Sequence, residues 1–452
     1  MLPIVVSLIK GFIMGKSFKP KSKKYSHARY AKRKLNSDRD VISYEDMPLE
    51  DYEQEKTDIS PQAVKKIVIG ICIALAVGLI VFAFANREKL TPDNISVWWN
   101  YDVLGNAGEG YPVNLVGTEV KPGNFSVNQN HVAYASDTSF ITLNSTGREI
   151  ANVQLRYTRP MLKAADNCYL TFGLGEKGFQ LQSFDKNIHN GETSGTIYNG
   201  DIASNGTYCL VEQGNGYLSE LEVFNKDNNR IYKYSFSEYY INTVTLRQDG
   251  LGCLVCGITS DGGKIKTGVY VLDFTKEEPV SKYEISSDYV SDCKYISSSR
   301  IALIGGAAAY IIKPGDENYI ELSYEDKPLA NYCFNPDTKS FAIALSKSGD
   351  GRSCTLISYN DNGEVTSSID TAYGAESISM YKGTIAVLDG NNVYGYESKT
   401  GLTIYSCDAG AGSKRIILTS DVKGYVLSIN QIRYIDFTNP ATPDTATRNQ
   451  GE

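Results

Sequence analysis

Histidine is the side chain best suited to acid–base catalysis near neutral pH, and this chain of 452 residues contains three. His27 lies in a highly charged N-terminal segment, whereas His131 and His189 lie in the long remainder of the chain. The sequence has no G-x-S-x-G nucleophile motif, H-E-x-x-H pair, phosphate-binding loop or dinucleotide fingerprint. General-base chemistry would have to depend on carboxylates or tyrosines that no motif singles out.

Two carboxylate pairs are the next candidates for acid–base chemistry, Glu277 with Glu278 and Asp361 near Glu364. Both lie in predicted turns, where solvated charge is the ordinary explanation. The glycine pair at 305–306 is followed by three alanines rather than by a helix start and a Lys-Ser/Thr pair, so it is typical of a close-packed strand or turn. We therefore assign no catalytic and no cofactor-binding residue, and we expect that the protein is not an enzyme.

Nine cysteines raise the question of a metal site or disulfides. In an extended strand Cys253 and Cys256 point to opposite faces, so this C-x-x-C pair cannot close on itself or hold one ion without a bulge. Zinc would need further ligands, and the chain has few histidines and no second C-x-x-C. We expect no metal site and mostly buried free thiols, with one or two disulfides left open. The other cysteines are Cys72, Cys168, Cys209, Cys293, Cys333, Cys354 and Cys407.

A repeated pattern of strands shows which elements must position these residues. Eight times, an apolar strand is followed by a turn, a second apolar strand, another turn and a more polar third strand. Successive repeats begin 37, 40, 44, 48, 40, 44 and 40 residues apart. A period near 40 built from strands predicts an all-β fold, an eight-bladed β-propeller, with seven blades as the alternative. The repeats are anchored at Val132, Tyr169, Cys209, Cys253, Ile301, Phe341, Ile385 and Tyr425.

The last repeat lacks its outer strand, because the chain after two clear strands turns into a polar tail rich in Pro and Thr, residues 439–452. We expect this tail to be disordered and the propeller to extend over residues 95–438. The segment ISVWWNYDVLG, which begins at Ile95 and ends at Gly105, has the apolar and aromatic character of an outer strand. We therefore predict that it completes the last blade and places Trp98 and Trp99 in or against the propeller. The alternative places these two side chains at a lipid interface.

An apolar run of nineteen residues without a charge begins at Ile67 and ends at Ala85. As a helix it would be about 28 Å long, enough to cross the hydrocarbon core of a membrane. Residues 1–66 carry 14 Lys and Arg against 9 Asp and Glu, and basic residues favour the cytoplasmic side. We expect a single retained transmembrane helix, with the N-terminus in the cytoplasm and the propeller outside the cell.

The N-terminal tail, residues 1–66, is basic over residues 16–39 and acidic over residues 40–58. Neither part has a sustained apolar face, so we expect the tail to be disordered. The basic part could contact anionic lipid, nucleic acid or a cytoplasmic partner, or could serve only as a topology signal; we expect no specific nucleic-acid binding. Residues 1–13 are too short to span a membrane, and Met14 opens a tail of its own, so either methionine could be the true start.

The strand and Thr-Gly turn patterns NNVYGYESKTGLTIYS and ITLNSTGREI resemble quinoprotein-like (PQQ-type) propeller repeats. The cytoplasmic tail, the single span, the motif YPVNLVG from Tyr111 to Gly117 and the eight repeats are similar to an uncharacterised bacterial family of membrane-anchored propellers, a domain of unknown function. The resemblance covers about residues 60–440. It implies a propeller fold. Quinone-dependent enzymes of the wider group use a vicinal cysteine pair and a tryptophan platform, and this chain has no adjacent cysteines, which argues against a bound quinone cofactor.

The rigid repeats, the retained anchor and the missing catalytic motifs favour a non-enzymatic, extracytoplasmic binding or scaffold protein. Its expected partners are an envelope protein or a wall polysaccharide. The alternatives are an extracytoplasmic, carboxylate-based glycan hydrolase or lyase, and a transmembrane ligand sensor. Polar side chains that converge on the propeller axis would be the most informative structural observation.

Overall fold

The computed structural model describes residue 72, residues 75–78, residue 81, residues 92–347, residue 349 and residues 351–438. Residues 72, 75–78 and 81 are helical. Most of the predicted transmembrane run, residues 67–85, and both predicted tails, residues 1–66 and 439–452, lie outside the described residues. Among the residues that are described, no helix has the length and apolar character needed to cross a membrane.

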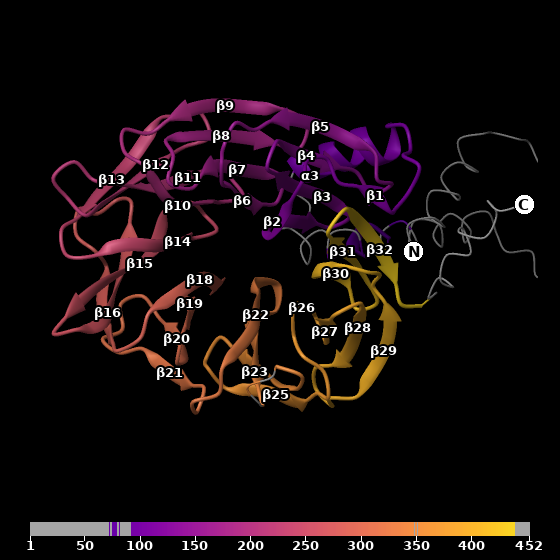
Figure 1. The fold of residues 1–452 in the computed structure, drawn as a ribbon. Coiled ribbons are helices and arrows are strands. Elements are labelled where there is room, and N and C mark those ends of the chain that lie inside the picture. The colour runs from indigo at the N-terminus through magenta and orange to yellow at the C-terminus, as the bar shows by residue number, and fades with distance from the viewer. Residues whose placement is uncertain are drawn as a thin grey trace, which may run out of the picture. The chain divides into compact units, whose positions relative to one another are not determined.

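Eight four-stranded antiparallel sheets form the blades of a propeller, arranged around a central axis (Figure 1). The first four blades contain β2 (Val120–Asn128), β3 (His131–Ser136), β4 (Ser139–Leu143) and β5 (Glu149–Gln154); β6 (Pro160–Ala165), β7 (Cys168–Gly173), β8 (Gly178–Ser183) and β9 (Asn187–Glu192); β10 (Ile197–Ile202), β11 (Tyr208–Glu212), β12 (Ser219–Phe224) and β13 (Arg230–Phe236); and β14 (Tyr240–Leu246), β15 (Gly252–Asp261), β16 (Lys264–Asp273) and β17 (Ser281–Ser286).

The remaining blades are built in the same way, except that the last one takes a strand from the start of the domain. They contain β18 (Val290–Ser297), β19 (Arg300–Gly305), β20 (Ala308–Ile312) and β21 (Ile320–Ser323); β22 (Leu329–Asn335), β23 (Ser340–Ser346), β24 (Cys354–Asn360) and β25 (Val365–Asp370); β26 (Ser377–Tyr381), β27 (Thr384–Asp389), β28 (Asn392–Glu397) and β29 (Thr403–Asp408); and β30 (Ser413–Ser420), β31 (Lys423–Ser428), β32 (Gln431–Asp436) and β1 (Val113–Asn114).

The first strand of each blade lies on the inside of the ring. Each of these strands contacts the first strand of the next blade, and β30 of the last blade contacts β2 of the first, so the ring is closed. Eight hydrophobic clusters fill the interfaces between the blades, one between each neighbouring pair. A blade buries both faces against its neighbours, which explains why its second strand is a continuous apolar run rather than an alternating one. The strand HVAYAS of β3, for example, is buried at every position.

The prediction of an eight-bladed, all-β propeller is confirmed. Each predicted repeat corresponds to the second, third and fourth strands of a blade, since the anchors Val132 and Tyr169 lie in β3 and β7. The inner strand of each blade was not part of the predicted repeat. Its side chains are partly exposed to the axis, so its pattern mixes apolar, polar and charged residues, as in VSDCKYIS of β18.

The prediction that residues 95–105 complete the last blade is wrong. Residues 95–105 are not a strand: α3 (Pro92–Trp98) is followed by a π-helical turn, η1 (Trp99–Val103). The missing outer strand is β1, where Val113 pairs with Ile432 and Asn114 pairs with Gln431. An N-terminal strand does close the ring, but it comes from the YPVNLVG motif.

The helical conformation of residues 92–103 has a local and a tertiary cause. Pro92 at the first position suits a helix start, because its fixed φ is helical and it has no N–H to satisfy there. Asn94, Val97 and Tyr101 are spaced by three and four residues, so a helix turns them to one side, where Val97 and Tyr101 pack on the cluster between the first two blades. Trp98 and Trp99 are 39% and 49% exposed and lie on the outward side of this segment.

Candidate functional site

Three adjoining cavities follow the axis of the propeller and form its central channel. One of about 660 Å³ is lined by the ends of the inner strands and their turns, such as Asn128 to Asn130, Asn335 and Tyr381. A second, of about 870 Å³, is lined along the inner strands, from Gly123, Leu329 and Lys414 near their beginnings to Phe334 and Met380 near their ends. A smaller cavity of about 190 Å³ shares Lys163, Asp292 and Arg415 with the second.

Charged side chains from four blades converge on the small cavity. Lys163 comes from β6, Asp201 from β10, Asp292 and Lys294 from β18, and Arg415 from β30. Charged residues inside strands are costly unless they face water or one another, so this convergence marks the channel as the polar interior of the fold. In this cavity, charges from separate blades meet.

Asparagines on the inner strands join neighbouring blades. The side-chain amide of Asn124 donates to the Pro160 carbonyl at 2.8 Å, that of Asn199 to the Asn242 carbonyl at 2.8 Å, that of Asn242 to the Val290 carbonyl at 2.7 Å, and that of Asn331 to the Glu376 carbonyl at 2.7 Å. Each bond ties one inner strand to the next, which makes the channel wall continuous. A bond of this kind contributes about 1 kcal/mol when buried.

Asp292 occupies the third position of β18, the position held by asparagine in β10, β14 and β22. Its Oδ1 accepts from the N–H of Cys293 at 2.8 Å, just as the side-chain oxygens of Asn199 and Asn331 accept from the next residue. A carboxylate cannot donate to the next blade, so its Oδ2 instead accepts from the hydroxyl of Tyr332 at 2.9 Å. The blade therefore carries a negative charge where its neighbours carry a neutral amide.

The two carboxylates of the small cavity accept hydrogen bonds from the protein itself. Asp201 is 5% exposed, and its Oδ2 accepts from the N–H of Leu246 at 2.8 Å, with Lys294 Nζ 4.0 Å away. Asp292 is bonded as described above. Burial, together with the charge of Asp292 and the hydrogen bond to it, raises the pKa of Tyr332, so the hydroxyl stays protonated as a donor.

Arg415 lies among these groups and is half-buried. Burial lowers the pKa of its guanidinium, although Tyr332 and Asp292 act in the opposite direction. One of its N–H groups donates to the Pro122 carbonyl, across the junction between the last blade and the first. Because arginine titrates far above neutral pH, the side chain remains charged.

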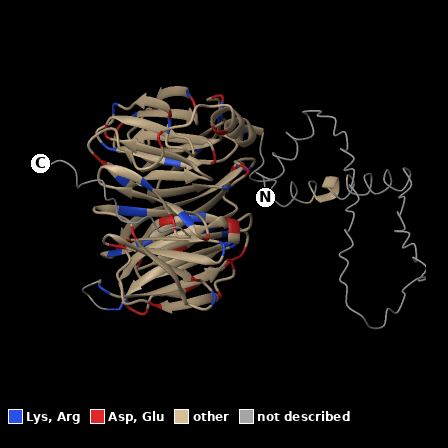
Figure 2. Ribbon diagram, turned by 90° about the vertical axis from the view of Figure 1, so that its right-hand side faces the viewer, with Lys and Arg blue, Asp and Glu red and all other residues tan. Residues whose placement is uncertain are grey.

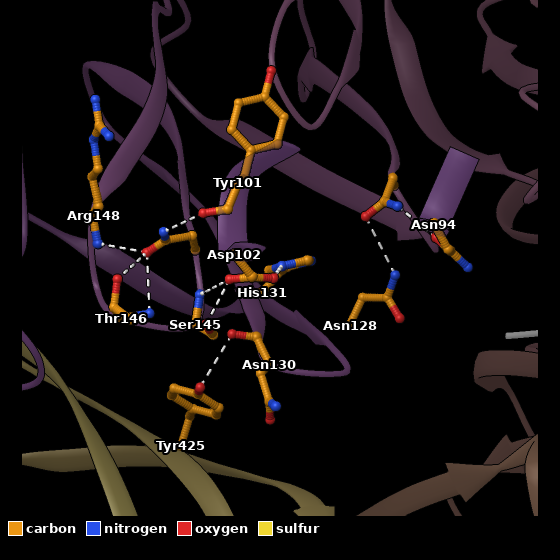
Figure 3. A network of polar contacts seen from close by, with 12 residues as sticks. Asn94, Tyr101, Asp102, Asn128, Asn130, His131, Ser145, Thr146, Arg148 and Tyr425 are labelled. Atoms are coloured by element: carbon orange, nitrogen blue, oxygen red, sulfur yellow. Dashed lines mark hydrogen bonds and ion pairs between the residues drawn. The ribbon is translucent and has the colours of Figure 1, made fainter. Parts of the chain in front are cut away.

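A second polar cluster, Asp102 with His131 and Ser145, has the residue types of a catalytic triad (Figure 3). The Asp102 carboxylate bonds His131 Nε2 at 2.5 Å and accepts from the Ser145 hydroxyl at 2.6 Å. The hydroxyl is thus bound to the carboxylate and not to the imidazole, which is opposite to the order that activates a serine. His131 is also 5% exposed and lies against Phe184, with ring centroids 4.7 Å apart.

This cluster fixes the α3–η1 segment to one face of the propeller. The Asn167 amide donates to Asn94, the Tyr101 hydroxyl donates to Asp185 at 3.0 Å, and the Asn144 amide donates to the Tyr101 carbonyl at 3.0 Å. The partner residues lie in or beside turns that join first to second and third to fourth strands. The segment therefore lies on the face where the inner strands end.

The other residues raised by the sequence do not enter the channel. Glu277, Glu278 and Glu364 are exposed in turns between third and fourth strands, at the outer rim of their blades. The glycine pair at 305–306 forms a turn whose N–H groups are taken by Asp288: Oδ1 accepts from Gly306 at 2.9 Å and from Ala307 at 3.3 Å. A side chain of the protein thus occupies the place where a phosphate would bind.

Cys253 and Cys256 point to opposite faces of β15, as predicted. Cys253 lies in the cluster toward the preceding blade and Cys256 in the cluster toward the following one. No disulfide joins the cysteines in the described part of the chain, where no group of three or more His, Cys, Asp and Glu could hold a metal ion. Burial raises the pKa of Cys209, Cys253 and Cys256 well above the usual value, so these thiols stay protonated.

Sequence reasoning missed the channel residues, although a signal was present. Lys163, Asp201, Asp292, Lys294 and Arg415 each stand six to ten residues before a repeat anchor, within a short strand-like stretch. A charge recurring at that phase of a propeller repeat indicates an inner strand facing the axis. Elsewhere, basic and acidic residues are interspersed over the propeller (Figure 2).

Several solved structures are similar to this chain at low identity. AztD from Citrobacter koseri is 10% identical with a TM-score of 0.48, and the match covers 65% of this chain and 88% of AztD. Sqt1 from Saccharomyces cerevisiae is 9% identical with a TM-score of 0.49, covering 73% and 100% of the two chains. BamB from Moraxella catarrhalis is 11% identical with a TM-score of 0.46, covering 74% and 100%.

No curated protein matches the sequence. A family model does match, over residues 117–436, which span the blades from just before β2 to the end of β32. The matched region is more than two thirds of the chain. The chain therefore belongs to the family of unknown function DUF5711.

Proposed function

We propose that this protein is a non-enzymatic, extracytoplasmic binding or scaffold protein, anchored in the cell membrane by the apolar run of residues 67–85. Its propeller presents the central channel to an envelope protein or a wall polymer. The observation that carries the proposal is the convergence of Lys163, Asp201, Asp292, Lys294 and Arg415 on the channel. A closed ring of eight blades is rigid, so these groups are held in place before a ligand arrives.

A binding role fits the channel better than carboxylate-based hydrolysis. A glycan hydrolase needs one carboxyl group free to donate a proton and a second free to attack or to activate water. Asp201 and Asp292 instead accept hydrogen bonds from a backbone N–H and a tyrosine hydroxyl, which hold them as structural acceptors. The small cavity also holds the cations Lys163, Lys294 and Arg415, which can donate to a ligand.

A protease-protection experiment tests the anchor and its direction. Protease added outside intact cells should remove the propeller and leave a membrane-bound fragment of about 85 to 95 residues, since the span and its basic inner flank would be protected. A chain that stays whole until the membrane is opened would refute the extracytoplasmic placement.

A binding experiment tests the role of the channel. The full chain, purified in detergent, is titrated with soluble fractions of wall polymer and followed by its thermal unfolding midpoint. Wild-type protein should be stabilised, and a variant carrying Lys163→Met and Arg415→Gln should not. Turnover of the polymer by wild-type protein would favour the hydrolase or lyase, and a change in the N-terminal tail on binding would favour the sensor.

A further inference from the structure

The channel contains more hydrogen-bond donors than the protein uses. The Lys163 ammonium has three N–H groups, and no hydrogen bond or ion pair joins it to another described residue. Arg415 has five N–H groups, of which one donates to Pro122. Lys294 lies 4.0 Å from Asp201, at the outer limit of an ion pair. Around the small cavity, Asp292 accepts hydrogen bonds at both carboxylate oxygens and Asp201 accepts one at Oδ2.

The net charge of the side chains around the small cavity also favours an anionic ligand. Three basic side chains face two acidic ones around a cavity of about 190 Å³. One monoanion would bring this set to neutrality. The half-buried position strengthens the attraction, because charges interact more strongly near a protein interior than in water.

The size and surroundings of the cavity limit the ligand. Since a water molecule occupies about 30 Å³ of liquid, the small cavity has room for a compact group and not for a chain of sugars. The adjoining cavity of about 870 Å³ is walled partly by Tyr332, Phe334, Met380 and Ile417, which can cover an apolar or ring-shaped remainder. A guanidinium beside two ammonium groups matches the planar, multiple-acceptor geometry of an oxyanion.

We propose that the channel is an oxyanion-binding site, in which Lys163, Lys294 and Arg415 hold a carboxylate or a phosphate group of a larger envelope ligand. The site rests on the proposed binding function and defines the chemical class of its ligand. Asp201 and Asp292 position the cations.

The experiment uses the full chain in detergent, with total ionic strength held constant by chloride so that screening does not change. N-acetyl-dialanine with a free carboxyl terminus is compared with its C-terminal amide, and glycerol 3-phosphate is compared with glycerol. Inorganic phosphate is the fifth probe. A saturable rise in the thermal unfolding midpoint reports binding to the folded state.

We expect the anion of at least one of the two pairs to stabilise the wild-type protein while its neutral counterpart does not, and the pair that responds identifies the carboxylate or the phosphate as the source. Lys163→Met should weaken that binding about tenfold, because one charged hydrogen bond is lost. Lys163→Arg should retain it. Lys399→Met, which removes the same charge from an exposed turn at the outer edge of a blade, should leave it unchanged.

Two outcomes would overturn the proposal: no anion stabilises the wild-type protein, or Lys163→Met and Lys399→Met respond equally, which would show a general effect of charge. If small anions fail but wall-polymer fractions still bind in a channel-dependent way, the oxyanion assignment is wrong and the binding function stands. If neither binds, both proposals fail.

Discussion

Closure of the ring by β1 can be tested by removing the side chain of Tyr111, which lies just before that strand. The Tyr111 ring packs edge-on against Tyr425 with centroids 5.1 Å apart and lies 6.5 Å from the Tyr434 ring, and its hydroxyl donates to the Asn144 carbonyl at 3.2 Å. Tyr111→Ala removes about 1 to 1.5 kcal/mol of burial for a half-covered ring, about 1 kcal/mol of aromatic pairing and about 1 kcal/mol of hydrogen bonding. We expect the free energy of unfolding to fall by about 3 kcal/mol.

Urea unfolding of the full chain provides the assay, followed by circular dichroism for the blades and by fluorescence for the α3–η1 segment, which contains both tryptophans. Tyr111→Phe should cost only about 1 kcal/mol, and Trp99→Ala, at a side chain 49% exposed, should stay within about 0.5 kcal/mol. Hydrogen exchange at the amides of β32 should accelerate in Tyr111→Ala. The reasoning is refuted if Trp99→Ala destabilises the protein as much as Tyr111→Ala while β32 stays protected.

Three further predictions concern packing, pH and thiol reactivity. Gly395→Ala should destabilise the protein by about 1 to 3 kcal/mol in urea unfolding, because its Cβ would lie 2.1 Å from the ring of Tyr405, whereas Gly383→Ala, with open space around it, should be nearly neutral; equal effects would contradict this packing. Burial opposes the ionisation of Asp102, but the hydrogen bonds from His131 and Ser145 outweigh burial and lower the pKa of this carboxyl group. The ionised carboxylate therefore stabilises the fold above about pH 4, and this stabilisation is lost as the pH falls through the pKa of the folded state. The stability gap between wild type and Asp102→Asn in urea titrations should therefore shrink between pH 7 and pH 3, and a constant gap would argue against it. Cys256, buried and protonated, should react with iodoacetamide at pH 8 only after unfolding, and reductant should change the thermal midpoint little; rapid labelling of the native protein, read by peptide mass spectrometry, would show that the strand opens.

By itself the sequence determined the class of fold and the number of blades. The second and third strands of a blade are covered on both faces by neighbouring blades, so they must be apolar along their whole length, and this requirement recurs about every 40 residues. Because the same pattern recurs in each repeat, the sequence also showed that the last repeat lacks its outer strand. The opposite orientation of Cys253 and Cys256 followed from the alternation of side chains along any strand.

The tertiary structure decided which segment closes the ring and which residues meet in the channel. β1 pairs over only two residues, too few to leave a periodic signal, whereas residues 95–105 are apolar enough to imitate a strand although Asn94, Val97 and Tyr101 dock as a helix. Lys163 and Arg415 stand 252 positions apart, and nothing in the sequence around either residue points to the other. They become one site because the inner strands of all eight blades surround a single axis, a condition set by closure of the ring and not by any local pattern.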